Sequence, residues 1–151
     1  MKVVDITVNK GDVLNEVAKT TAYSGAKMTG EEGAYERIFT TKSDREMLER
    51  FWTECQVSVC ETLKKFLQQE ETTDEGWNLK LGLSESFDDT LIKSIKKELF
   101  SFFVTGIVAK WYVFTNKKEA GEYEGSASHL LVGIHKKVLF KKKPTRPTNY
   151  K

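Results

Sequence analysis

Proline, cysteine and histidine are scarce in this sequence, with two residues of each among 151. Two prolines and ten glycines are too few for a collagen-like or low-complexity chain. Two cysteines are also too few for the disulfide framework that stabilises many small secreted domains. Hydrophobic residues make up 39% of the chain and charged residues 30%, which is typical of a globular protein. The length suffices for one domain with its own core.

Long hydrophobic runs are absent as well. The longest apolar-rich stretch, Leu99 to Phe114, is shorter than the ~20 residues of a membrane span and contains Ser101, Thr105 and Lys110. Asp5 interrupts the start of the chain before any apolar region develops, which is unlike a secretory signal. We therefore expect a protein that is made and kept in the cytoplasm and does not contact a membrane.

The sequence offers no recognisable catalytic, cofactor-binding or metal site. His129 and His135 lie six residues apart, which is not the spacing of a metal-binding pair. Cys55 and Cys60 lie five apart in a predicted helix, so their side chains point roughly 140° apart and cannot form a disulfide. No glycine-rich phosphate loop occurs. We predict a protein without enzyme activity or cofactor; the alternative of a small enzyme would need a site built from tyrosine, lysine and carboxylate groups.

Two segments alternate between apolar and polar residues with the period of a β-strand, at residues ~3–8 and ~77–84. The first contains Val4, Ile6 and Val8, and the second runs from Trp77 to Leu83. Pairing between them is possible, but the alternation alone does not establish it.

Helical periodicity covers most of the remaining chain. We expect a helix from Asp12, its N-cap, to about residue 28, and a short turn over residues 34–41 that docks on the core. Ser43 and Glu46 match a capping box, which predicts a helix from about Asp44 to Leu67 followed by a loop over 68–76. A third helix begins after a cap at Ser86 or Asp88 and ends at Asn116, and a last one covers 117–140.

These elements predict a mainly α fold: a bundle of three long helices plus a shorter N-terminal helix, with a small β element. We expect one helical domain over residues 1–140 and an extended basic C-terminal arm over residues 141–151. Phe100–Phe114 is apolar on every side, so this half of the third helix is either central or covered by another chain. In the second case its aromatic residues would contribute to a subunit interface; the candidates are Phe103, Trp111 and Tyr112.

The charges are distributed unevenly. Residues 136–151 include seven basic residues and no acidic one, whereas residues 1–135 carry 17 basic and 22 acidic residues. Prolines keep the arm extended. Its candidate partner-binding residues are Lys141, Lys142, Lys143, Pro144, Arg146, Pro147 and Tyr150. The arm could lie on the acidic body of a neighbouring subunit and close a ring, could contact nucleic acid, or could be a solvated tail.

Two pairs of segments resemble small proteins encoded in the structural gene clusters of tailed phages and prophages. One pair is Gly33–Phe39 with Asp44–Trp52, and the other is Gly106–Tyr112 with Lys143–Pro147. The layout of a helical body ending in an extended arm is similar to that of head–tail connector (neck) proteins, which form rings beneath the portal. The resemblance covers most of the chain from about Asp12 onward.

The resemblance implies a non-enzymatic virion structural protein that joins portal and tail through subunit contacts. Its partners would be the portal, neighbouring connector or tail proteins and further copies of itself in a ring, with DNA contact secondary. The protein would be assembled in the host cytoplasm and located in the virion. The alternative is a cytoplasmic binding module whose basic tail contacts nucleic acid.

Overall fold

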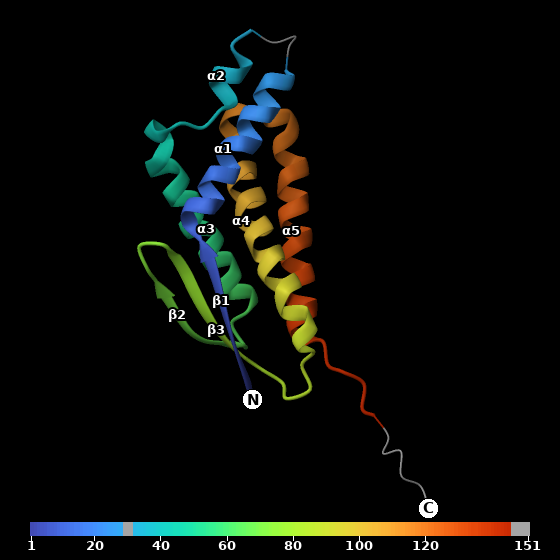
Figure 1. The fold of residues 1–151 in the computed structure, drawn as a ribbon. Coiled ribbons are helices and arrows are strands. Elements are labelled where there is room, and N and C mark those ends of the chain that lie inside the picture. Colours follow the sequence, from blue (N-terminus) through green and yellow to red (C-terminus); the bar gives the residue numbers. More distant parts are fainter. Residues whose placement is uncertain (29–31, 146–151) are drawn as a thin grey trace, which may run out of the picture.

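The structure is a computed structural model that describes residues 1–28 and 32–145. Long helices lie side by side, and a small sheet covers the lower part of one side of the bundle (Figure 1). In chain order the elements are β1 (Lys2–Asn9), α1 (Lys10–Lys27), α2 (Ala34–Ile38), the 3-10 turn η1 (Lys42–Asp44), α3 (Arg45–Thr62), β2 (Leu67–Thr72), β3 (Gly76–Leu83), the 3-10 turn η2 (Asp89–Leu91), α4 (Ile92–Thr115) and α5 (Lys117–Leu139).

The predicted mainly α fold with a small β element is confirmed, but the helix lengths differ from the expectation. α1 and α3 have 18 residues each, α4 has 24 and α5 has 23, so the N-terminal helix is as long as α3. α4 is the central helix, since it packs against α5, α1, α3 and β1. This position explains why most of its second half is apolar, although Val113 and Phe114 near its end are exposed.

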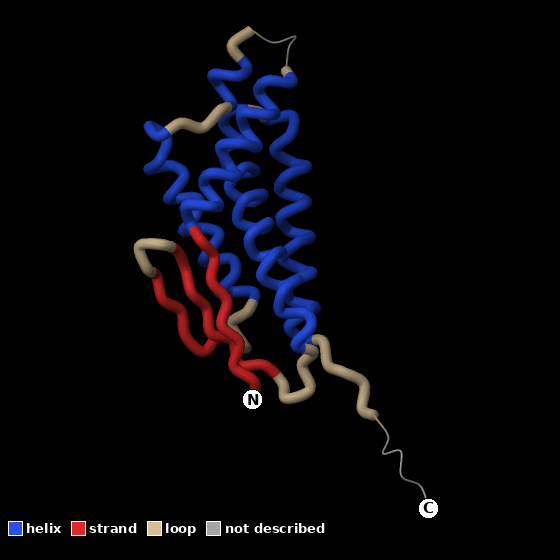
Figure 2. Tube along the Cα trace, viewed as in Figure 1, coloured by secondary structure: helices blue, strands red, loops and turns tan. Residues whose placement is uncertain are grey.

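The sheet is antiparallel with strand order β1-β3-β2 (Figure 2). Both predicted strands are present, and they pair with each other in a register that places Ile6 opposite Leu79. The third strand, β2, occupies residues that we expected to form a loop. Its residues after Leu67 are all exposed, so it shows no alternation of apolar and polar side chains that could have indicated a strand.

The end of α3 is the largest difference from the prediction. The helix ends at Thr62, not at Leu67, although Leu63, Phe66 and Leu67 continue its apolar period. The amides of Phe66 and Leu67 both donate to the carbonyl of Leu63, at 2.9 and 3.0 Å. The carbonyl of Phe66 then accepts from Gly82 in β3 at 2.7 Å. This tight turn keeps the same apolar side chains against the core while the chain enters β2.

Two helix caps also differ from the expected residues. The carboxylate of Asp44 accepts from the amide of Thr41 at 2.8 Å, so the capping box begins at Thr41 rather than Ser43. The hydroxyl of Ser43 lies 2.7 Å from that of Thr41 instead. At the start of α1, the side chain of Asn9 accepts from the amide of Asp12 at 2.9 Å, so Asn9 is the cap. Asp88, one of the two caps predicted for the third helix, caps the 3-10 turn η2 that leads into α4, since its side chain accepts from the amide of Thr90 at 3.0 Å. α4 itself begins at Ile92 without a side-chain cap.

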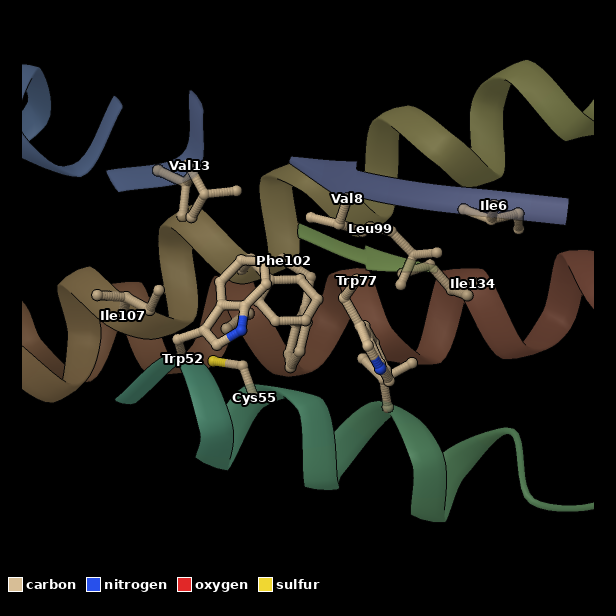
Figure 3. Packing of buried hydrophobic residues seen from close by; sticks show 14 of the residues in the cluster. Ile6, Val8, Val13, Trp52, Cys55, Trp77, Leu99, Phe102, Ile107 and Ile134 are labelled. Carbon is tan, nitrogen blue, oxygen red and sulfur yellow. The ribbon is translucent and has the colours of Figure 1, made fainter. Parts of the chain in front are cut away.

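A single cluster of buried side chains joins the sheet to the helices (Figure 3). The ring centroid of Phe103 on α4 lies 4.5 Å from Trp52 of α3 and 5.8 Å from Trp77 of β3. The segment Asp89–Thr115 is long and apolar enough to cross a membrane by length and composition alone, and 56% of its most apolar window is buried inside the fold. Such burial is what the core helix of a globular protein shows.

Candidate functional site: the root of the C-terminal arm

The arm begins with a change of backbone direction at the end of α5. Phe140 leaves the helix with extended dihedral angles, φ −67° and ψ 131°. Lys141 then forms an isolated antiparallel bridge with Phe87, and the amide of Lys142 donates to the carbonyl of Ser86 at 2.8 Å. The root of the arm is therefore attached by main-chain hydrogen bonds to the connection between β3 and α4.

Charged groups from the N-terminus surround this root. The ammonium of Lys2 donates to the carbonyl of Phe87 and to the carboxylate of Asp89, both at 3.1 Å. The terminal amine of Met1 pairs with Glu85. The connection between β3 and α4, to which residues 141 and 142 are attached, is thus also tied to the start of β1.

Hydrogen bonds favour the ionised form of two acidic residues in this connection, Asp88 and Glu85. Hydrogen bonds from the hydroxyl and amide of Thr90, at 2.7 and 3.0 Å, lower the pKa of Asp88, and the charges of Lys142 and Lys2 contribute in the same direction. The hydrogen bond from the terminal amine lowers the pKa of Glu85. Both carboxylates are exposed, so their role is to orient the basic groups rather than to add much stability.

The four predicted arm residues within the described part of the chain are all exposed. Lys141, Lys142, Lys143 and Pro144 extend beyond the end of the bundle (Figure 1). Among the described residues, no ion pair holds the three ammonium groups. The other predicted arm residues, Arg146, Pro147 and Tyr150, lie outside the described residues.

The predicted interface aromatics are buried within the chain itself. Phe103 and Tyr112 are 0% exposed and Trp111 is 6% exposed. The indole nitrogen of Trp111 donates to the carbonyl of Ile38 at 2.6 Å, and the ring of Tyr112 packs edge-on against Tyr123 at 5.1 Å. Of the two expected alternatives, these three side chains fit that of a central helix, because they are covered within the chain; Tyr112 contacts the last helix, α5.

The cysteine thiols have the properties of structural groups. Burial raises the pKa of Cys55 to about 12. Burial, together with the nearby Glu70 carboxylate, raises the pKa of Cys60 to about 12, and its sulfur donates to that carboxylate at 2.9 Å. Both thiols are protonated at neutral pH, and a protonated thiol is a poor nucleophile. Within residues 1–28 and 32–145, no group of three or more His, Cys, Asp or Glu side chains is placed to hold a metal ion.

A groove that the sequence did not indicate runs between α3 and α5, with α4 as its floor. It has a volume of about 350 Å³ and is lined by Cys55 and Ser58 of α3, Gly106 and Lys110 of α4 and Glu124 of α5, among others. Lys110 bridges to Glu54 at 3.2 Å and Arg50 to the same carboxylate at 3.4 Å. The groove is open to solvent, and of the two charged residues that line it, Lys110 is paired with Glu54.

The second feature missed by sequence reasoning is the acidic edge strand. Residues 68–75, which comprise β2 after Leu67 and the following turn, are all exposed and contain Glu70, Glu71, Asp74 and Glu75 without a basic residue. The clustering of acidic residues was visible in the sequence, but its position on a sheet edge depends on the pairing of β2 with β3.

No protein-family model, curated protein or solved structure matches the chain.

Proposed function

We propose that the protein is a non-enzymatic structural subunit of a tailed-phage virion, a component of the head–tail connector ring that joins portal and tail. The observation that carries the proposal is the anchored basic arm. Main-chain hydrogen bonds at Lys142 and Lys141 hold its root, while its exposed ammonium groups extend away from the body. A segment that is anchored at its first residues and carries unpaired positive charge is suited to binding a neighbouring protein.

The arm is proposed to be extended over residues 141–151. Pro144 and Pro147 restrict the unbound chain, so less conformational entropy is lost when the arm docks. The body, residues 1–135, has an acidic excess of five, which favours a protein of its own kind as the partner. Contact between the arm of one copy and the body of the next is heterologous, and such contacts generate closed rings when the rotation permits.

Native mass spectrometry and electron microscopy of the purified full chain test the proposal. We expect ring-shaped oligomers at low ionic strength and their dissociation at high salt, because exposed charge pairs are screened within a Debye length of ~10 Å at 0.1 M. A variant lacking residues 141–151 should keep the helical circular dichroism signal of the full chain and remain monomeric.

A second variant keeps the root of the arm intact and serves as a control for folding. Replacing Lys143, Arg146 and Lys151 by glutamine removes charge without touching the hydrogen bonds at residues 141 and 142. It should be as stable as the full chain and fail to form rings. A protein that remains a folded monomer and loses only salt-dependent affinity for duplex DNA in this variant would instead support the nucleic-acid-binding module.

A further inference from the structure

The outer edge of β2 is an unpaired sheet edge. β2 pairs with β3 on one side only, and the strand order β1-β3-β2 places it at the border of the sheet. Figure 2 shows it as the outermost strand, with no described segment beyond it. Its backbone amides and carbonyls that point away from β3 are therefore available to an additional strand, the mode of recognition in which an extended peptide joins an exposed edge.

The charge of this edge restricts what can pair with it. Glu70, Glu71, Asp74 and Glu75 lie in residues 67–75, and no basic residue lies there. Two copies of this edge would repel each other, because like charges on adjacent strands destabilise pairing. An extended segment that carries positive charge and no negative charge is favoured instead.

Residues 143–151 of this chain have that composition. They contain Lys143, Arg146 and Lys151 and no acidic residue. At ~3.3 Å per residue, nine extended residues span ~30 Å, whereas the six residues of β2 span ~20 Å. The segment is thus long enough to follow the whole edge.

The arm of the same copy is directed elsewhere. Its root is fixed to Ser86 and Phe87, and residues 141–145 run away from the bundle on the side opposite β2 (Figure 1). Reaching the edge of β2 from this direction would require the chain to reverse after its anchored root. A second copy can supply the arm without such a reversal.

We propose that the free edge of β2 is the docking site for the basic C-terminal arm of a second copy of this chain. The inference rests on the proposed function, because it names the surface that receives the arm. Arg146, Thr148 and Tyr150 are two residues apart, so in one register of the added strand their amides all face β2. Pro147, which has no amide hydrogen, then faces away from β2, a position that edge strands tolerate. Pro144 would face β2 in the same register, so the added strand begins after it and comprises residues 145–151. Seven extended residues span ~23 Å, which still covers the ~20 Å of β2.

Charge reversal on both sides of this contact tests the inference with the full chain. The edge variant carries Glu71→Lys, Asp74→Lys and Glu75→Lys; Glu70 is left unchanged because it accepts the hydrogen bond from Cys60. The arm variant carries Lys143→Glu, Arg146→Glu and Lys151→Glu. The matched control carries Glu61→Lys, Glu122→Lys and Glu124→Lys, three exposed helix residues that give the same change in net charge as the edge variant.

Sedimentation velocity of each protein and of their mixtures measures the association. We expect the unmodified chain and the control to associate. Each of the edge and arm variants alone should associate with a dissociation constant at least tenfold higher, and so remain monomeric at concentrations where the unmodified chain associates. An equimolar mixture of the two variants should associate again, because each basic edge then meets an acidic arm and each acidic edge meets a basic arm. Circular dichroism verifies that both variants are folded.

Three results would overturn the inference. If the edge variant associates like the unmodified chain while the arm variant does not, the arm docks elsewhere and the connector proposal stands without this site. If the mixture fails to associate although both variants are folded, the two segments are not in contact. If the unmodified chain stays monomeric at every concentration, copies do not exchange arms in solution, while incorporation into virions remains a separate test of the proposed function.

Discussion

The indole groups of Trp111 and Trp77 provide a matched test of the packing described above. Both are buried, with 6% and 0% exposure. Trp111 donates from its indole nitrogen to the carbonyl of Ile38 at 2.6 Å and so joins α4 to α2. The indole nitrogen of Trp77 has no hydrogen-bond partner among the described residues. Replacing either residue by phenylalanine removes the same atoms, but only Trp111→Phe removes a hydrogen bond.

The expected difference follows from these contacts. Each replacement leaves a small cavity, which we expect to cost about 1–3 kcal/mol of unfolding free energy. Trp111→Phe also leaves the buried carbonyl of Ile38 without that donor, at an additional cost of about 1–3 kcal/mol. Trp77→Phe removes an unpaired buried donor, which offsets part of its cavity cost. Trp111→Phe should therefore be the more destabilising variant by about 1–3 kcal/mol.

Urea unfolding followed by far-ultraviolet circular dichroism measures both values without depending on tryptophan fluorescence. The dependence of the free energy on urea should stay the same in the two variants, so that a shift in midpoint reports stability. Equal losses, or a larger loss for Trp77→Phe, would refute the reasoning, because the bond to Ile38 would then contribute nothing to stability.

Three further predictions concern single positions. Asp44→Ala should lower the unfolding free energy by about 0.5–2 kcal/mol through loss of the capping box, whereas Ser43→Ala should change it by less than about 0.5 kcal/mol; equal urea midpoints for the two variants would contradict the cap assignment. Gly25→Ala should cost about 1–3 kcal/mol, since a Cβ there would lie 2.9 Å from the backbone of α2, whereas Gly121→Ala, with nothing within 4 Å, should be neutral or stabilising in the same titration. Cys60 should react slowly with a thiol reagent at pH 8 and faster only as the pH approaches its pKa of about 12; rapid labelling of the folded protein at pH 8 would show that the thiol is not protected.

The sequence correctly predicted the helices and strands in which apolar, buried side chains recur with a single helical or strand period. The alternation of Val4, Ile6 and Val8 matches the buried face of β1, and Asn116 does separate α4 from α5. The helical recurrence of apolar residues was misleading at the end of α3. Leu63 and Phe66 continue to face the core although the backbone has already left the helix. β2 escaped detection because an edge strand with both faces in solvent has no apolar alternation.

Local polar contacts were harder to assign than the elements themselves. Thr41 and Ser43 can both start a capping box by residue type, and only the backbone geometry shows that the box pairs Thr41 with Asp44. In α4, the apolar surroundings of Trp111 and Tyr112 fit either a central helix or an interface. The choice depends on how α1, α3 and α5 pack around it, which the sequence of α4 alone does not specify.

The root of the arm was likewise not predictable, although the arm itself was visible as a run of charge. The bridge between Lys141 and Phe87 joins residues 54 positions apart, and the tie from Lys2 to Asp89 joins residues 87 apart. Pairings over such separations follow from the tertiary fold. The attachment of residues 141 and 142 to the connection between β3 and α4 is therefore visible only in the structure.

The central claim is that this chain is a structural subunit in the neck of a tailed phage particle. Cryo-electron microscopy of purified tailed particles, combined with mass spectrometry of their proteins, tests it most directly. The claim predicts that the chain is present in several copies and that a ring between portal and tail shows density for α1, α3, α4 and α5 with the three-stranded sheet. Particles that are complete and infectious but contain none of this chain would contradict it.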